Sequence, residues 1–209
     1  MTVDLNGVHY PVDIVFRRQK RIVLRFLKNT FKVSAPKRTP LHWIQQQILN
    51  HGQGLILTIK QIPSPWTPEG MYVFGRWQSL NEVTQTFSLK PPVNIEQLGY
   101  DLKRLKKVFL PPLLDRVRYW QKHLNINTVY RISVRNMRSR LGSNSRKTKR
   151  LTFALKLIHF SWPTIDAVIV HELIHDRHFD HSPRFYQSLL QAYPQYRQEH
   201  AKILKGQYE

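Results

Sequence analysis

With 209 residues, 41% of them hydrophobic, the chain can bury a core and form one domain, or one domain with a small appendage. The absence of cysteine excludes disulfide-stabilised folds and thiolate metal sites, and it fits the reducing cytoplasm, where we expect the protein to reside. The 33 lysine and arginine residues outnumber the 13 acidic residues to give a net charge of +20, which favours polyanionic partners, nucleic acid first and an anionic membrane second.

The basic residues gather in two stretches of the sequence. Nine lysines or arginines and no acid occur from Arg17 to Arg38, and eight with no acid occur from Arg131 to Arg150. A solvated basic surface is the alternative to a nucleic-acid contact, because no helix-turn-helix, RNA-recognition or zinc-finger pattern accompanies the charge. The N-terminal residues do not resemble a signal peptide, and no apolar run reaches the roughly 18 residues of a membrane span.

The N-terminal part of the chain has the pattern of an antiparallel β-sheet followed by a helix. Three strands are expected, at 8–16, 22–27 and 31–35. Apolar residues recur at every second position in each of them, with mostly polar residues between them in the first and third. Thr39 is a good N-cap and Pro40 a good first helical residue. We expect the helix that begins there to end at Gly52 and Gly54.

The middle of the chain predicts short strands and then two amphipathic helices. A proline-rich stretch at 62–68 reads as a loop or extended linker. The expected strands span 72–76 and 86–89, and the expected helices span 98–109 and 113–124. We expect the two helices to be separate because Pro111 and Pro112 lie between them.

The last third of the chain predicts two more strands and two more helices. The strands are expected at 130–134 and 151–157, on either side of a basic, serine-rich loop at 138–150. Ser161 or Thr164 can cap the next helix. A final helix is expected between Arg184 and Lys205. The whole pattern is that of an α+β protein.

The helix after Ser161 contains the sequence His171-Glu172-Leu173-Ile174-His175. Two imidazoles four residues apart on a helix lie about 6 Å apart along its axis and nearly on one face, where one tetrahedral Zn²⁺ can bind both. Glu172 can then reach a water on the metal and act as the general base of a metal-dependent hydrolase. Apolar residues on nearly every side predict a buried helix, and a bound cation would offset the burial of the carboxylate.

A third ligand requires the chain to turn back after this helix. His181 follows the second ligand by six residues, about 240° round an unbroken helix, so it can bind the same ion only if the helix ends near Phe179. Residues that favour such a break follow there: Asp180, Ser182 and Pro183. His178 is the alternative ligand, but its Cα would lie about 10.5 Å along the axis from that of His171. We favour His181.

Three stretches of the sequence resemble motifs of one family. The HELIH of 171–175 and the HSPRFY of 181–186 are similar to its HELxH…HSPxFW signature. The stretch 138–145 resembles its SRWGSCS motif, and 33–40 resembles its VxAPxxxP junction between a strand and a helix. This family is the YgjP-like metallopeptidases, small zincins related to the SprT-like proteins. Four residues depart from its pattern: Leu141 and Asn144 stand in place of Trp and Cys, and Asp176 and His178 in place of Leu and Glu.

The resemblance implies a zincin-like metallopeptidase core over 96–209, with the HExxH helix beside a small sheet. The N-terminal antiparallel β-rich region with one helix would then span 1–95. It also implies a protein or peptide substrate and a Zn²⁺ cofactor with the ligands His171, His175 and His181. In this fold the expected strand at 151–157 would lie beside the helix and could pair with an extended peptide.

Three imidazoles leave one zinc position open, which is typical of a catalytic site. Glu172 would move a proton from the water to the leaving amine. Several side chains could hold the oxyanion, and the sequence leaves the choice open: Arg138, Arg140, Ser143 and Tyr186. Asp166 and Asp180 are candidates to orient a ligating histidine. The alternative functions are a nucleic-acid-binding protein with a structural zinc or an inactive protease site, a protease recruited to DNA, and hydrolysis of a non-peptide amide.

Overall fold

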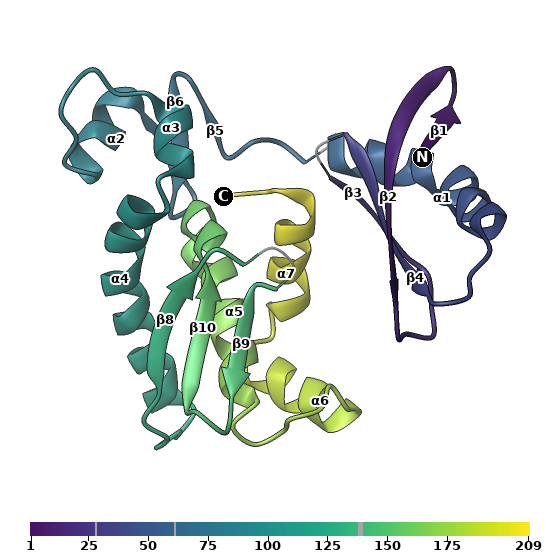
Figure 1. The fold of residues 1–209 in the computed structure, drawn as a ribbon. Helices are drawn as coiled ribbons and strands as arrows, with labels where there is room; N and C mark the ends of the chain where they lie inside the picture. Colours follow the sequence, from purple (N-terminus) through teal and green to yellow (C-terminus); the bar gives the residue numbers. More distant parts are fainter. Residues whose placement is uncertain (28, 61, 138–139) are drawn as a thin grey trace. The chain divides into compact units, whose positions relative to one another are not determined.

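The computed structural model describes residues 1–27, 29–60, 62–137 and 140–209 of the chain. These residues form two compact units, Met1–Pro63 and Ser64–Glu209. Both units combine strands with helices, so the expected α+β class is confirmed (Figure 1).

The division between the units lies earlier in the chain than the expected boundary at residues 95 and 96. Met71 and Val73, which precede that position, pack in the same core as Leu105 and Phe109, which follow it. Apolar contacts therefore join the segment from residue 64 onward to the larger unit.

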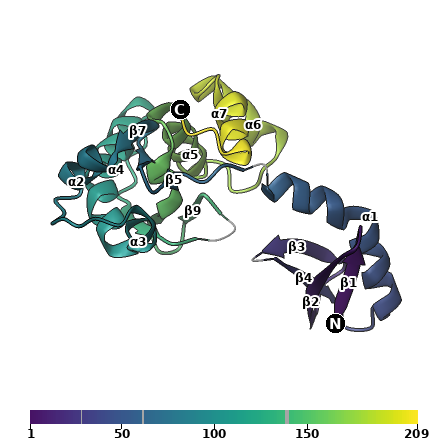
Figure 2. The ribbon, with the colours of Figure 1, turned by 90° about the horizontal axis from the view of Figure 1, so that it is seen from above.

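The smaller unit is a four-stranded sheet with one helix along one face (Figure 2). Its elements are β1 (Thr2–Leu5), β2 (Val8–Arg17), β3 (Val23–Leu27), β4 (Thr30–Pro36) and α1 (Leu41–Lys60). The strand order is β1-β2-β4-β3. Alternate residues of the strands, such as Val12, Phe26 and Phe31, are buried against α1 in a single core.

The sheet of the smaller unit is mixed, whereas the alternation of residues led us to expect an antiparallel sheet. β4 is antiparallel to β3 but parallel to β2, with Val12 opposite Phe31 and Arg17 opposite Pro36. In the strand order, β4 lies between β3 and β2. The alternation of side chains is the same for both kinds of pairing, so it carried no information about strand direction.

Gly52 does not end α1, which continues to Lys60. The buried stripe of this helix steps by four residues through Ile44, Ile48 and Gly52. A Cβ atom on Gly52 would lie 2.9 Å from Leu5 Cδ1 and 2.9 Å from Phe31 Cζ. The glycine is therefore used for the close approach of the helix to the sheet, not for a C-cap.

The larger unit contains two three-stranded sheets and most of the helices. Its first half comprises β5 (Trp66–Thr67), β6 (Gly70–Val73), β7 (Arg76–Ser79), α2 (Leu80–Thr86), α3 (Ile95–Tyr100) and α4 (Leu102–His123). Its second half comprises β8 (Arg131–Arg135), β9 (Gly142–Ser145), β10 (Arg150–Ala154), the 3₁₀ helix η1 (Leu155–His159), α5 (Trp162–Ile174), α6 (Pro183–Ala192) and α7 (Tyr196–Lys205).

The strand expected at 151–157 is central in its sheet and shorter than expected. β10 pairs with β8 in parallel and with β9 in antiparallel, in the order β8-β10-β9. Both of its edges are therefore occupied, and it cannot accept a peptide by strand addition. The chain leaves the sheet at Ala154 and enters η1, whose apolar residues stay in the core.

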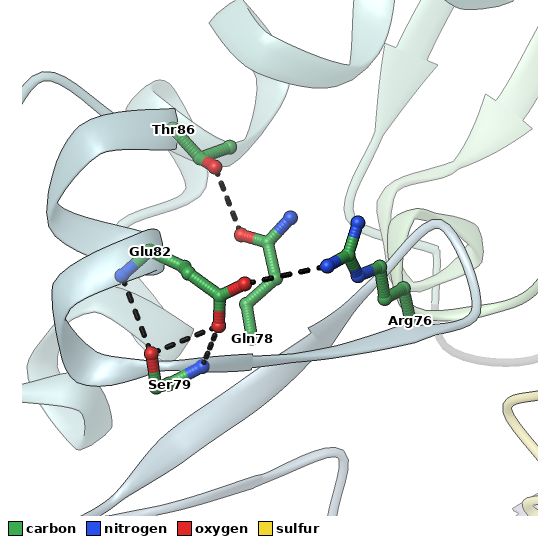
Figure 3. A network of polar contacts seen from close by, with 5 residues as sticks. All are labelled: Arg76, Gln78, Ser79, Glu82 and Thr86. Carbon is green, nitrogen blue, oxygen red and sulfur yellow. Dashed lines mark hydrogen bonds and ion pairs between the residues drawn. The ribbon is translucent and has the colours of Figure 1, made fainter.

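The segment expected as a strand at 86–89 instead follows a short helix, α2. Ser79 caps this helix: its hydroxyl accepts a hydrogen bond from Glu82 N, while the Glu82 carboxylate accepts one from Ser79 N at 2.8 Å (Figure 3). Thr86 Oγ1 donates to Gln78 Oε1 at 2.9 Å, and Arg76 pairs with Glu82 at 3.6 Å. The capping box starts a helix that runs to Thr86, so the expected strand does not form.

Pro111 and Pro112 lie inside one continuous helix, α4, and do not separate two helices. The residues that both expected helices used for burial lie on one stripe of α4: Leu105, Phe109, Leu113 and Val117. All of them belong to one core. Burial of this stripe therefore outweighs the backbone hydrogen bonds that the two prolines remove.

The helix α5 is surrounded by other elements, as its apolar sequence predicts. It packs against α4, α6, α7 and β9 (Figure 1). Asp166 pairs with Arg116 of α4, and Thr164 donates to Glu199 of α7 at 2.7 Å. Two buried polar residues of α5 are thus matched to partners on neighbouring helices. Across the four described ranges, we find no helix with the length and apolarity to cross a lipid bilayer.

The buried imidazole of His159 makes the stability of the larger unit depend on pH. The side chain is 4% exposed, and its Nδ1 donates to the Tyr72 carbonyl at 2.9 Å. Burial lowers the pKa of His159 to about 4. The unfolded chain binds this proton near pH 6.5, so the stability that His159 contributes is complete above pH 6.5 and is lost as the pH falls towards 4.

We expect the free energy of unfolding to fall by about 3 kcal/mol from this protonation of His159. His159→Gln keeps a donor for the Tyr72 carbonyl but has no charged form, so its urea midpoint should fall less between pH 7 and pH 4. His51→Gln, which changes an exposed imidazole on α1, should show the same fall in urea midpoint between pH 7 and pH 4 as the unaltered chain. If the urea midpoint of His159→Gln falls as much as that of the unaltered chain, His159 is not the source of this pH dependence.

Candidate functional site

The chain reverses direction directly after α5, and this reversal builds the site. α5 ends at Ile174, earlier than the expected end near Phe179. Asp176 N then donates to Leu173 O at 2.9 Å, and Arg177 N donates to Ile174 O at 3.0 Å. These two bonds close a tight turn, so the chain that follows runs back beside the helix.

The reversal brings His181 to His171 and His175. One nitrogen from each ring lies within 4.8 Å of the others, and Nε2 of His181 is 3.1 Å from Nε2 of His171. Ligand nitrogens around a tetrahedral Zn²⁺ are about 3.3 Å apart, as bonds of about 2.05 Å require. Among the described residues, these three imidazoles form the group that can hold a metal ion.

His178, the alternative ligand, is not part of this group. Its ring Nε2 lies 3.1 Å from Ser188 Oγ, and its carbonyl accepts a hydrogen bond from His175 Nδ1 at 2.8 Å. Its backbone thus fixes the tautomer of a neighbouring imidazole, because Nδ1 carries the proton and Nε2 keeps its lone pair.

Tyr196 of α7 orients His171, and sequence analysis missed it. Its hydroxyl lies 3.0 Å from His171 Nδ1, and the two rings stack at 5.7 Å. Of the two carboxylates that we considered for this role, Asp166 pairs with Arg116, and Asp180 is exposed, although its charge acts on His175. No local spacing links residues 171 and 196, so only the packing of α7 on α5 reveals the contact.

Phe185 forms the apolar floor of the histidine cluster. It is fully buried on α6, and its ring lies 5.0 Å from His171, 4.6 Å from His175 and 4.9 Å from His181 between centroids. The ring stacks on His175 and meets the other two imidazoles edge-on. One side chain thus limits the rotation of all three.

The imidazoles are held in the form that binds a cation. Burial, with the neighbouring imidazoles as a second cause, lowers the pKa of His171 to about 3. Burial also lowers the pKa of His175. These two rings are therefore neutral near pH 7, and a metal ion does not have to displace a proton from them.

Glu172 is a buried carboxylate beside the edge strand β9. It is 5% exposed, and burial raises its pKa to about 8, although the positive charge of Arg140 opposes the rise. A Cβ atom on Gly142 would lie 2.5 Å from Glu172 Oε1 and 2.6 Å from its Cγ. The carboxylate therefore occupies the space that any other residue at 142 would need. A cation nearby would stabilise its charged form.

A chain of hydrogen bonds ties β9 to the end of α5. Asn144 Nδ2 donates to the Glu172 carbonyl at 2.8 Å and to the Tyr130 hydroxyl at 3.0 Å. The Tyr130 hydroxyl donates in turn to Asp176 Oδ1 at 2.7 Å. Asn144 and Asp176 are two of the four departures from the family motifs, and Tyr130 joins them into one network.

The residues considered for the oxyanion have different positions. Ser143 lies on β9, and Arg140 precedes that strand. The ring of Tyr186 is 6.2 Å from that of His181 and is partly exposed. Arg138 lies outside the described residues.

Comparison with known proteins decides the family. The profile of the YgjP-like, metallopeptidase domain family matches residues 20–206. The chain belongs to the YgjP-like metallopeptidase family. The resemblance drawn from the HELIH and HSPRFY motifs is thereby confirmed, and the YgjP-like chain has the divalent-metal chemistry of a peptidase.

Two solved structures are similar to part of the YgjP-like chain. The metallopeptidase zymogen jannalysin of Methanocaldococcus jannaschii shares 27% identity with a TM-score of 0.41, over 44% of this chain and 94% of that chain. The metallopeptidase zymogen abylysin of Pyrococcus abyssi shares 16% identity with a TM-score of 0.41, over 44% of this chain and 91% of that chain. No curated protein matches the YgjP-like chain.

The contact of Gly142 with Glu172 predicts the effect of adding one methyl group. Gly142→Ala should displace the carboxylate and lower peptidase kcat by about tenfold or more, because displacements near 1 Å cost about that much or more. Gly54→Ala is the matched control: a Cβ atom there meets nothing within 4 Å, so activity should not change. Peptide cleavage by Gly142→Ala at the unaltered rate would show that the carboxylate position is unimportant.

Proposed function

We propose that this YgjP-like protein is a zinc peptidase in which His171, His175 and His181 hold Zn²⁺ and Glu172 is the general base. The single observation that carries the proposal is the convergence of three imidazoles within 4.8 Å beside a buried carboxylate. Three nitrogen donors without thiolates suit Zn²⁺ and leave one position free for water and substrate. When bound, Zn²⁺ would supply the polarisation of the water and of the scissile carbonyl.

The carboxylate of Glu172 does the proton transfer in this proposal. Its Oε1 lies close to the backbone of β9 at Gly142, where a Cβ atom would be only 2.5 Å away. It accepts a proton from the attacking water and delivers that proton to the leaving amine nitrogen. The Asn144 hydrogen bond to the Glu172 carbonyl holds this part of α5 against β9 during the transfer.

The substrate we propose is an extended peptide that pairs with β9. This strand lies at the edge of the sheet order β8-β10-β9 and contacts α5. Strand addition would place successive peptide units alongside the carboxylate, which is the geometry a peptidase requires. We expected a peptide to pair with the strand that is now β10, and we propose β9 in its place.

A nucleic-acid-binding role is the second candidate, and the net charge of +20 favours it. A structural zinc is not favoured, because a structural site takes four protein ligands and this cluster of described residues has three. We therefore propose nucleic-acid contact as an addition to peptidase activity, as in a protease recruited to DNA. The location that we propose is the cytoplasm.

Glu172→Gln tests the proposed mechanism most directly. The amide keeps the shape of the side chain but cannot accept the proton, so kcat for a fluorogenic peptide should fall by about 10² to 10⁴. Zinc content, measured by elemental analysis, should stay near one ion per chain because Glu172 is not a ligand. Unaltered peptide cleavage by this variant would exclude Glu172 as the base.

Phe185→Leu tests whether the ring of Phe185 holds the three imidazoles in place for Zn²⁺. Loss of the ring should loosen the three imidazoles and weaken Zn²⁺ affinity by about 10- to 100-fold, as changes around metal ligands commonly do. The measurement is competition with a zinc-binding dye. Phe109→Leu removes an equally buried ring from α4 and should leave the zinc affinity unaltered. Equal losses in both variants would mean that general destabilisation is the cause.

A further inference from the structure

The parallel pairing of β2 with β4 brings basic residues from distant parts of the sequence to one end of the N-terminal sheet. Arg17, the last residue of β2, lies opposite Pro36, the last residue of β4. Arg18 follows β2 directly, and Lys37 and Arg38 follow β4 directly. Had the two strands been antiparallel, these pairs would lie at opposite ends of the sheet.

The loop between β2 and β3 adds two more cations at the same end. Gln19 ties this loop to β4, because its Nε2 donates to Arg21 O and to Ser34 O, each at 2.7 Å. Lys20 and Arg21 are therefore held beside the ends of β2 and β4. We call six exposed residues the basic end of the sheet: Arg17, Arg18, Lys20, Arg21, Lys37 and Arg38.

Within the described part of the smaller unit, no acidic residue offsets this charge. The chain contains no Asp or Glu from residue 14 to residue 68. The two acids of the smaller unit pair with other residues, Asp13 with Lys32 and Asp4 with His9. The basic end thus presents uncompensated positive charge, which attracts a polyanion.

The positive charge continues onto the face of the sheet that α1 leaves uncovered. Arg25 alternates with buried Phe26, which faces α1, so it lies on the opposite face of the sheet, and its strand partner is Lys32. Lys37 and Arg38 instead lie in the connection from β4 to α1, the helix that covers the other face. Cations on two sides of the sheet end suit a flexible strand that can bend around it, whereas a flat lipid surface meets one side at a time.

An exposed indole lies next to the basic end. Trp43 is 60% exposed in the first turn of α1, where its backbone N donates to Pro40 O at 3.2 Å. Proteins that bind single strands without sequence preference combine a basic path for phosphates with aromatic rings on which bases stack. The base of a duplex is already stacked, so an exposed indole suits an unpaired strand.

We propose that the smaller unit binds single-stranded nucleic acid. The guanidinium groups of the basic end would bind phosphate oxygens, and Trp43 would stack on a base. Four of the six cations are arginines, whose planar fork matches two phosphate oxygens at once. This binding uses none of the residues of the histidine cluster and does not depend on the proposed peptidase chemistry.

The test is fluorescence anisotropy of the full chain with a labelled oligothymidylate of about 20 nucleotides, from about 50 to about 200 mM NaCl. The triple variant Arg17→Glu, Arg21→Glu and Arg38→Glu should bind at least about tenfold more weakly and lower the salt slope by about 2, since each lost phosphate contact removes about 0.7. Trp43→Ala should weaken binding about tenfold and leave the salt slope unaltered.

The matched control moves the same charge change to α4. Lys103→Glu, Lys106→Glu and Lys107→Glu change three exposed lysines, and this variant should retain its affinity within about threefold. Equal weakening in both triple variants would overturn the proposal, because net charge alone would explain it. Tighter binding to phosphatidylserine vesicles than to the oligonucleotide would assign the basic end to a lipid surface. If the triple variant misfolds by circular dichroism, Arg38→Gln should still lower the salt slope by about 0.7, and an unaltered slope would also overturn the proposal.

Discussion

The burial of polar and ionisable groups on an apolar helix is the constraint that shapes the larger unit. α5 has no solvent face, yet it carries Asp166, His171 and Glu172. Groups of this kind are stable in a core only when each has a partner. Two of these partners come from far along the sequence: Arg116 of α4 pairs with Asp166, and the Tyr196 hydroxyl of α7 lies beside His171. Asn144 of β9 bonds the backbone carbonyl of Glu172, and a bound cation would balance the carboxylate itself.

The core of the candidate site followed from local sequence rules. The four-residue spacing of His171 and His175 and the apolar flanks of their helix fix the placement of two imidazoles on a buried helix. The turn-forming residues after them indicated that the chain would reverse and return His181 to the pair. The turn is tighter than expected because His175 itself bonds the His178 carbonyl, a contact that has no signature in the sequence.

Several features that escaped sequence analysis depend on contacts between distant residues. Strand alternation reports which face is buried but not strand direction, so the parallel pairing of β2 and β4 was missed. Proline rules describe an isolated helix, and they failed for α4 because its buried stripe runs past Pro111 and Pro112 into one core. Tyr196 and Phe185 act through packing of α7 and α6, and no spacing in the sequence measures that.

The contact between Tyr196 and His171 has a consequence for biosynthesis. Tyr196 of α7 orients a ring that the ribosome has made 25 residues earlier. While the C-terminal residues are still in the exit tunnel, α5 lacks one of its covering helices and His171 lacks its hydrogen-bond partner. The emerging polypeptide therefore orders the imidazole of His171 only after α7 has been made and has packed on α5.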